Sequence, residues 1–192
     1  MDVEFVLSAP DLASRPPRVL PEFAFVGRSN CGKSSLINLF LDRRGMAKIS
    51  GKPGKTRLLN YFLVDNTYYL VDLPGYGFAK VSKTLRAAWT RLMKAYLFAG
   101  DRPLAVIQLL DARHRPSAED RLMTGWLHKA KLPFAVAVTK VDKVGRNKRG
   151  AHYQEIVDTL GLTPETPFFP TSAVTREGAG DLKAWIAAVL AT

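Results

Sequence analysis

Short apolar blocks and amphipathic blocks alternate along the chain and predict strands and helices in turn. Apolar runs typical of buried strands occupy four stretches, residues 23–26, 104–110, 134–139 and 168–171. Each is followed by a segment with apolar residues at helical spacing, and these segments are residues 33–41, 117–129, 147–160 and 180–190. Ser117 and Asp120 have the spacing of a capping box. The alternation predicts an α/β fold with a mostly parallel sheet covered on both faces.

Two further features complete the predicted topology. Residues 58–64 and 67–71 are apolar and aromatic runs separated by Asp65-Asn66, which predicts a β-hairpin and therefore one antiparallel pair. Residues 82–97 predict a helix, because their large apolar side chains recur at helical spacing. Residues 1–21 contain four prolines and no sustained periodicity. We therefore expect an extended N-terminal arm before a single domain at residues 22–192.

Length and composition fit one globular domain that stays in the cytoplasm. The chain has 192 residues, of which 47% are hydrophobic and 23% charged. No apolar stretch approaches the roughly 18 residues needed to span a bilayer, and the first residues lack the features of a signal peptide. The single cysteine, Cys31, cannot form an internal disulfide, which agrees with a reducing compartment. We expect a cytoplasmic monomer with no membrane partner.

The net charge of +11 is concentrated in two segments without acidic residues. Residues 43–64 hold six basic residues and residues 73–100 hold five, so together they equal the net charge. The other 17 basic residues are matched by the 17 acidic ones. Charge in blocks indicates an anionic partner more strongly than charge spread evenly.

The strongest functional signal is the run Gly27-Arg28-Ser29-Asn30-Cys31-Gly32-Lys33-Ser34, the G-x-x-x-x-G-K-S pattern of a phosphate-binding loop. It lies between a predicted strand and a predicted helix, so backbone N–H groups can converge on the α- and β-phosphates. Lys33 supplies a positive charge for the β/γ oxygens, and the Ser34 hydroxyl is placed to ligate Mg²⁺. The alternative is a glycine-rich turn with an exposed Lys and Ser. We interpret Cys31 as a small filler of the loop.

A second signal, Asp72-Leu73-Pro74-Gly75, follows the strand predicted at residues 67–71. Ligands of open α/β sheets gather at the carboxyl ends of strands. We expect Asp72 to hold Mg²⁺ through a water and the Gly75 N–H to contact the γ-phosphate. Taken alone, this four-residue pattern fits a plain turn better than a nucleotide-binding segment. It favours a nucleotide site only because the same chain also contains the phosphate-binding loop.

Two later strand ends carry residues suited to a guanine base. Thr139-Lys140-Val141-Asp142 places a carboxylate that can accept hydrogen bonds from guanine N1–H and the 2-amino group, a donor pair that adenine lacks. The Lys140 stem is expected to pack on the base. Thr171-Ser172-Ala173 offers the Ala173 N–H to guanine O6, although an ordinary strand-ending ST-turn explains this run equally well.

Thr56 lies in the glycine-rich, basic stretch at residues 51–57 that includes Gly54 and Lys55. It is the one threonine of that stretch, between the first predicted helix and the hairpin. In a GTPase this segment closes over Mg²⁺ when the γ-phosphate is present, and a flexible surface loop is compatible with that role.

These five elements, in this order and spacing, resemble those of the translation-factor-related small GTPases. Four runs narrow the resemblance to the EngB (YihA/YsxC) family of bacterial GTP-binding proteins. They are Phe25-Val26-Gly27-Arg28-Ser29-Asn30-Cys31-Gly32-Lys33-Ser34-Ser35, Gly54-Lys55-Thr56, Asp72-Leu73-Pro74-Gly75-Tyr76-Gly77 and Thr139-Lys140-Val141-Asp142. Thr139 stands where many GTPases have asparagine, and it fits this family.

The resemblance implies a Ras-like P-loop GTPase fold with a six-stranded sheet and one antiparallel edge strand. It also implies a GTPase that helps to assemble the large ribosomal subunit. The metal ligands it implies are Ser34, Thr56 and Asp72, with Lys33, Thr56 and Asn30 in catalysis. The residues expected to bind GTP or GDP are Gly27, Arg28, Ser29, Asn30, Cys31, Gly32, Lys33, Ser34, Ser35, Gly54, Lys55, Thr56, Asp72, Leu73, Pro74, Gly75, Thr139, Lys140, Val141, Asp142, Thr171, Ser172 and Ala173.

Hydrolysis is expected to be slow, because Tyr76 stands where better-known GTPases have the glutamine that orients the attacking water. Asn30 resembles the asparagine of GTPases in which a bound K⁺ substitutes for an arginine finger. The alternative is that Asn30 only stabilises the loop by hydrogen bonding.

The two basic segments coincide with the expected switch regions, around Thr56 and just beyond Gly75. We therefore expect the GTP-bound form to dock on ribosomal RNA of the large subunit or its precursor, and not on DNA. The expected phosphate contacts include Lys48, Lys52, Lys55, Arg57, Lys80, Lys83, Arg86 and Arg91. The alternatives are a solvated cationic face, an RNA-binding factor with a non-catalytic GTP site, and another kind of P-loop NTPase.

Overall fold

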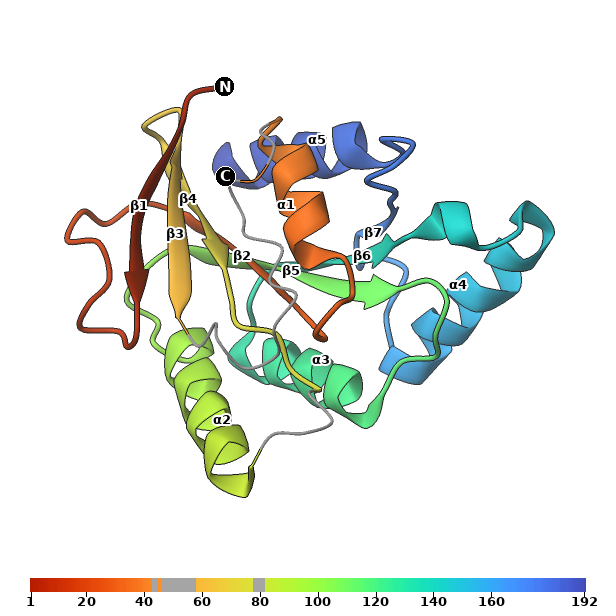
Figure 1. Cartoon of the computed structure of the whole chain (residues 1–192), viewed down its shortest axis with the longest axis horizontal. Helices are drawn as coiled ribbons and strands as arrows, with labels where there is room; N and C mark the ends of the chain where they lie inside the picture. Colours follow the sequence, from red (N-terminus) through yellow and green to blue (C-terminus); the bar gives the residue numbers. More distant parts are fainter. Residues whose placement is uncertain (43–44, 46–57, 78–81) are drawn as a thin grey trace.

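The computed structural model describes residues 1–42, 45, 58–77 and 82–192. In this part of the chain, seven strands form one sheet in the order β1-β3-β4-β2-β5-β6-β7 (Figure 1). The strands are β1 (Val3–Ala9), β2 (Glu22–Gly27), β3 (Leu59–Val64), β4 (Tyr68–Asp72), β5 (Leu104–Asp111), β6 (Phe134–Thr139) and β7 (Phe168–Pro170). The helices are α1 (Lys33–Phe40), α2 (Lys83–Leu97), α3 (Ala118–Ala130), α4 (Arg146–Leu160) and α5 (Ala179–Leu190), with a 3-10 turn, η1, at Val141–Lys143.

The predicted α/β architecture is confirmed. Strand β2 runs parallel to β4 and β5, and β6 runs parallel to β5 and β7. The predicted hairpin is the antiparallel pair of β3 and β4. The capping box is present, since the Ser117 side chain accepts from the Asp120 N–H and the Asp120 carboxylate accepts from the Ser117 N–H.

The sheet differs from the expected one in its edge. Seven strands, not six, occur in the described residues, because Val3–Ala9 of the expected arm forms β1 and pairs antiparallel with β3. The antiparallel part therefore comprises two pairs of strands rather than one. A bulge between Phe5 and Leu7 shifts the register of β1 and interrupts its inside-outside alternation, so no period-two pattern identifies this strand in the sequence.

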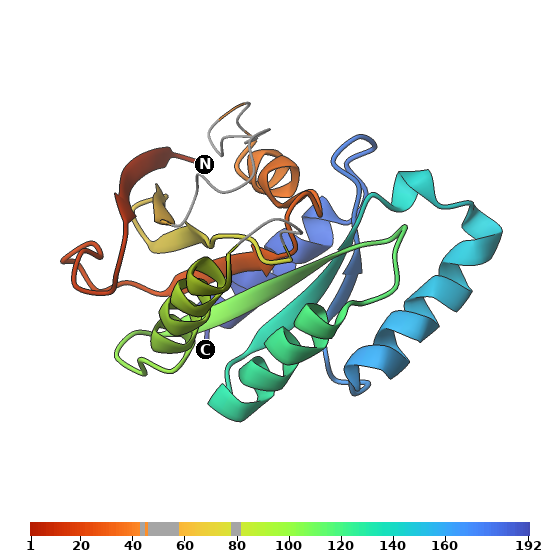
Figure 2. The ribbon, with the colours of Figure 1, turned by 60° about the horizontal axis from the view of Figure 1, so that its bottom comes forward.

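Helices lie on both faces of the sheet (Figure 2). Leu36, Ile37 and Phe40 of α1 pack with Leu182 and Ile186 of α5 against one face. Side chains of α2 and α3 pack against the other face, and α4 covers β6 next to them. Buried aliphatic and aromatic side chains on both faces fix the strand ends relative to one another. The carboxyl ends of β2, β4, β5, β6 and β7 thus point to one edge.

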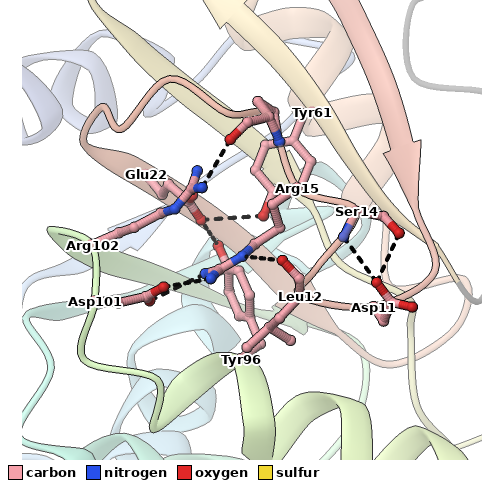
Figure 3. A network of polar contacts seen from close by, with 10 residues as sticks. Asp11, Leu12, Ser14, Arg15, Glu22, Tyr61, Tyr96, Asp101 and Arg102 are labelled. Carbon is pink, nitrogen blue, oxygen red and sulfur yellow. Dashed lines mark hydrogen bonds and ion pairs between the residues drawn. The ribbon is translucent and has the colours of Figure 1, made fainter.

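A buried polar network lies at the opposite end of the strands (Figure 3). Glu22, at the start of β2, is 1% exposed and accepts hydrogen bonds from the Tyr96 hydroxyl at 2.6 Å and the Arg102 guanidinium at 3.2 Å. Arg102 also donates to the Pro16 carbonyl at 2.8 Å, which fastens the segment before β2. Burial raises the pKa of Glu22 even though the Tyr96 hydrogen bond and the charge of Arg102 act to lower it.

Replacing Arg102 with methionine is expected to lower the free energy of unfolding by about 3 kcal/mol, because it leaves Glu22 buried without its cation. Affinity for GDP, the ligand that the sequence motifs predict, should not change, since those motifs follow the carboxyl ends of the strands and the network lies at the opposite end. Urea unfolding measures the first quantity and a fluorescent-GDP titration the second. Arg176→Met is the control, because Arg176 and Asp42 form an exposed pair at 65% and 69% exposure and should contribute less than about 1 kcal/mol. Equal losses in the two variants would contradict the prediction.

Candidate guanine-nucleotide site

The phosphate-binding pattern forms the predicted loop between β2 and α1. Strand β2 ends at Gly27, and Gly32, with φ of +100°, is the N-cap of α1. A Cβ on Gly32 would lie 3.3 Å from Lys140 Cε and 3.4 Å from Thr139 Oγ1, so glycine is needed both for the backbone angle and for the approach to the end of β6. The loop thus leads into a helix N-terminus, the arrangement that suits phosphate groups.

The loop is bonded directly to the segment after β4. The Lys33 ammonium group forms an ion pair with the Asp72 carboxylate, and both side chains are largely buried. The Ser29 N–H donates to the Tyr76 carbonyl at 2.8 Å, and the Tyr76 N–H donates to the Gly27 carbonyl at 3.2 Å. A Cβ on Gly75 would lie 3.2 Å from both Gly27 O and Ser29 N. The structure therefore brings together the first two motifs, which are far apart in the sequence.

The end of β6 is bonded to the other side of the loop. The Thr139 hydroxyl donates to the Cys31 carbonyl and, at 3.1 Å, to the Leu110 carbonyl. Lys140 has φ of +60°, and its ammonium group donates to the Asn30 carbonyl at 2.6 Å. The sequence assigned the Lys140 stem to the base, and the structure adds that its charged end holds the phosphate loop.

The expected guanine-binding residues meet at the next strand end. The Ser172 hydroxyl donates to the Asp142 carboxylate at 2.7 Å, and the Val141 N–H donates to the Thr171 carbonyl at 3.2 Å. The Ser172 hydrogen bond, opposed by slight burial and helped by Lys143, lowers the pKa of Asp142. Asp142 is therefore an ionised acceptor at neutral pH. The Ser172 oxygen also accepts from the N–H groups that follow it, so the ST-turn and the contact with Asp142 occur together.

Asp111, the last residue of β5, belongs to this constellation although the motifs did not identify it. Its carboxylate lies 2.9 Å from the Lys140 ammonium group and 2.7 Å from the Arg113 guanidinium. Burial acts to raise the pKa of Asp111, but hydrogen bonds from Arg113 and Lys140 outweigh it and lower the pKa to about 2. An acidic residue at the end of a buried strand is the signal that could have found it.

Acidification is expected to remove the contribution of Asp111 to stability. Because its pKa falls from 3.8 to about 2 on folding, the ionised form stabilises the fold above pH 4, and this stabilisation is lost as the pH falls toward 2. Allowing for solvent screening, the contribution is about 1–2 kcal/mol. Urea unfolding of the wild type and of Asp111→Asn should differ by this amount at pH 5 and converge near pH 2. A difference independent of pH would contradict the assignment, and Asp181→Asn on α5 is the control.

Tyr76 and Cys31 are both held in the interior. The Tyr76 hydroxyl donates to Asp120 at 2.7 Å, and its ring packs edge-on against Trp89 with centroids 5.6 Å apart. Burial and the Asp120 charge raise the pKa of Tyr76, so the phenol stays protonated. Burial raises the pKa of the Cys31 thiol to about 11, and a Cβ on Gly27 would meet its sulfur at 2.7 Å. Both side chains therefore act in packing.

Some expected site residues lie outside the described part of the chain. Gly54, Lys55 and Thr56 are among them. Within the described residues, no group of three His, Cys, Asp or Glu side chains is placed to hold a metal ion. The same part of the chain has no helix long and apolar enough to cross a membrane. Of the residues expected to hold Mg²⁺, Ser34 and Asp72 lie in the described part of the chain, and their oxygens are hard donors of the kind that Mg²⁺ binds together with phosphate oxygens.

Comparison with known proteins places the chain in a family. Residues 22–140 match the family of 50S ribosome-binding GTPases. The chain is 45% identical over 179 residues to a probable GTP-binding protein EngB of Syntrophotalea carbinolica, covering 93% of this chain and 86% of that protein. It is also 45% identical over 177 residues to the corresponding protein of Pelotomaculum thermopropionicum, covering 92% and 89%. The chain belongs to the EngB family. The resemblance drawn from the sequence motifs is confirmed.

Solved structures agree on the fold of this EngB-family chain. A crystal structure of a probable GTP-binding protein EngB superposes with a TM-score of 0.72 at 21% identity, covering 88% of this chain and 98% of that one. Era superposes with a TM-score of 0.64 at 25% identity, covering 90% of this chain and 56% of that one. That Era structure contains MgGDPNP and nucleotides 1506–1542 of 16S ribosomal RNA. The P-loop GTPase fold is therefore confirmed.

Proposed function

We propose that this EngB-family chain binds GTP with Mg²⁺ where β2, β4, β6 and β7 end, and hydrolyses the GTP slowly. The observation that carries the proposal is the set of contacts joining four motifs at one edge of the sheet. They are the contacts of Lys33 with Asp72, Thr139 with Cys31, Lys140 with Asn30, and Ser172 with Asp142.

Each of these groups has a role suited to its chemistry. Lys33 neutralises β- and γ-phosphate oxygens, and Ser34 with Asp72 would hold Mg²⁺, which would supply positive charge beside the phosphates. Asp142 accepts from the guanine N1–H and 2-amino groups, and Ser172 keeps its carboxylate in place. The Ala173 N–H serves guanine O6. Thr56, with Gly54 and Lys55, completes the proposed site from residues outside the described part of the chain.

The position of Tyr76 supports slow hydrolysis. Its hydroxyl donates to Asp120 and its ring packs on Trp89, so it is not free to orient a water molecule. We propose instead that K⁺ held by Asn30, whose φ is +64°, supplies positive charge near the phosphates. Phosphate release measured in KCl and in NaCl tests this, and equal rates would remove K⁺ from the mechanism. GTP binding without any turnover would leave only a regulatory site.

The second part of the proposal is that the GTP-bound chain acts in assembly of the large ribosomal subunit by docking on its RNA. Helix α2 supports it, because its cations Lys83, Arg86, Arg91 and Lys94 are exposed and the helix has no acidic residue. At 100° per residue, these cations project from a sector of the helix about 140° wide. Lys94 lies 5.5 Å from the Trp126 ring of α3. Lys48, Lys52, Lys55, Arg57 and Lys80 lie outside the described residues.

Co-sedimentation with large ribosomal subunits tests this part. More of the chain should sediment with the subunits in the presence of a non-hydrolysable GTP analogue than in the presence of GDP. The binding should weaken steeply as the KCl concentration rises. Arg86→Gln/Arg91→Gln should remove the difference between nucleotides. Arg18→Gln/Lys129→Gln is the control, because it removes two exposed cations from the opposite end of the sheet. Equal sedimentation with GDP and the analogue would contradict a nucleotide-gated role.

A further inference from the structure

Three ion pairs beside the proposed guanine site present their cations outwards. They join Arg113 to Asp111, Arg115 to Glu155 and Lys143 to Asp142. In these pairs the cation is 45%, 85% and 61% exposed, whereas the carboxylate is 9%, 34% and 13% exposed. A partner at this surface meets the positive member of each pair first, so the local field is positive although the charges balance.

The cations come from three segments, the turn after β5, η1 and α4, and contacts hold the turn against α4. His152 of α4 has its Nδ1 3.0 Å from the Ala112 carbonyl, and Arg115 reaches Glu155 of α4 at 2.7 Å. Lys148 is exposed and lies one helical turn before His152, on the side of α4 that faces the turn after β5. Figure 1 shows that turn beside α4. We name the outer cationic face by its residues, which are Arg113, Arg115, Lys143 and Lys148.

A cavity of about 180 Å³ lies behind this face, against the phosphate loop. Arg28, Arg113, His114 and Arg115 are among the side chains that line it. Two carboxylates line it as well, and both are engaged. Asp111 binds Arg113 and Lys140, as described above, and Asp120 accepts from Ser117 and Tyr76. Ser29, Asn30 and Cys31 of the phosphate loop line it too, so the cavity adjoins the proposed nucleotide site.

We propose that the outer cationic face binds backbone phosphates of ribosomal RNA in both nucleotide states and anchors the chain while α2 makes the GTP-dependent contacts. This rests on the proposed function. The face is formed by the turn after β5, by η1 and by α4, none of which contains the segment Asp72-Leu73-Pro74-Gly75. Helix α2, in contrast, is tied to that segment, because the Trp89 indole donates to the Pro74 carbonyl at 2.9 Å. Arginine suits this role because its guanidinium can donate two hydrogen bonds to one phosphate.

The test uses Arg115→Gln/Lys148→Gln, which removes two cations of the face that we have not placed in the nucleotide site. Binding of purified large-subunit ribosomal RNA is measured in the GDP form and in the GTP-analogue form across a KCl series. The variant should lose about tenfold in affinity in both forms, and its slope of log affinity against log salt should fall by about 1.5. Arg86→Gln/Arg91→Gln should weaken only the GTP-analogue form. Unchanged GDP affinity shows that the site and the fold are intact.

Three outcomes are distinguishable from the expected one. If the wild type binds RNA and Arg115→Gln/Lys148→Gln loses no more than the Arg18→Gln/Lys129→Gln control, the outer cationic face is not an RNA site and the proposed function stands. If the variant loses affinity for ribosomal subunits but not for purified RNA, the partner is an acidic protein and the inference is overturned. If the wild type binds neither RNA nor subunits, the proposed docking function fails together with this inference.

Discussion

Replacing Asp142 with asparagine is expected to lower the affinity for GDP about a thousandfold and to create affinity for xanthosine diphosphate. In the proposed site the carboxylate accepts two hydrogen bonds from guanine, and two charge-assisted bonds contribute about 4 kcal/mol together. Xanthine has a carbonyl where guanine has the 2-amino group, so an asparagine amide can donate to it. The Ser172 hydroxyl keeps an oxygen acceptor in the variant, so the loop should stay in place. Titration of the wild type and the variant with fluorescent GDP and fluorescent xanthosine diphosphate measures both changes in affinity.

A matched variant separates base recognition from loss of charge. Glu177→Gln removes a carboxylate that is 43% exposed in the loop before α5 and pairs with Arg149, and it should leave both affinities unchanged. If Asp142→Asn still binds GDP within tenfold of the wild type, Asp142 does not recognise the base. The guanine site would then have to lie elsewhere.

Replacing Lys33 with alanine should reduce GTP turnover about a thousandfold. The proposed role of Lys33 is to neutralise charge that develops on the phosphate oxygens, and the loss of one such donor costs a factor of about 10² to 10³. The same change leaves Asp72, whose side chain is 8% exposed, without its cation, so the free energy of unfolding should fall by about 3 kcal/mol. Phosphate release and urea unfolding measure the two effects.

A second variant tests whether the stability effect comes from the unpaired carboxylate. Lys33→Ala/Asp72→Ala removes both members of the ion pair, so it should regain much of the lost stability. It also lacks a proposed metal ligand, so it should regain no turnover. If the double variant recovers turnover as well, the defect of Lys33→Ala lies in folding rather than in phosphate chemistry. Turnover of Lys33→Ala within tenfold of the wild type would exclude a catalytic role for the lysine.

Local sequence patterns predicted most of the secondary structure. The helix at Ala118–Ala130 begins at the predicted Ser117 cap, because the capping box depends only on residues three apart. The hairpin of β3 and β4 was also predictable, since two apolar runs flank a short turn. Strand β1 was missed because it gains its partner, β3, from a distant part of the chain, and its bulge hides the alternation.

The motifs located the candidate site, and the tertiary structure added the residues that hold it together. Glycine positions and the lysine of the phosphate loop follow from spacing alone. Asp111, in contrast, has no motif, and its contact with Lys140 exists because β5 and β6 are neighbours in the sheet. For Tyr76, the sequence predicted only that it does not orient the attacking water as a glutamine would. Its contacts with Asp120 and Trp89 depend on how α3 and α2 pack.

By itself, the sequence determined the order of strands and helices from residue 22 onwards, the four strand-end motifs and the family, because each depends on residue types at short, fixed spacings. It also located the net charge in two segments, because charges can be counted along a chain. Only the tertiary structure decided which strand forms the edge and which way each ion pair points. Arg115 is 85% exposed and its partner Glu155 34%, and this difference exists only once α4 packs beside the turn after β5. An ion pair adds nothing to the net charge, but folding decides whether its cation or its carboxylate is the more exposed, and so decides the sign of the local field.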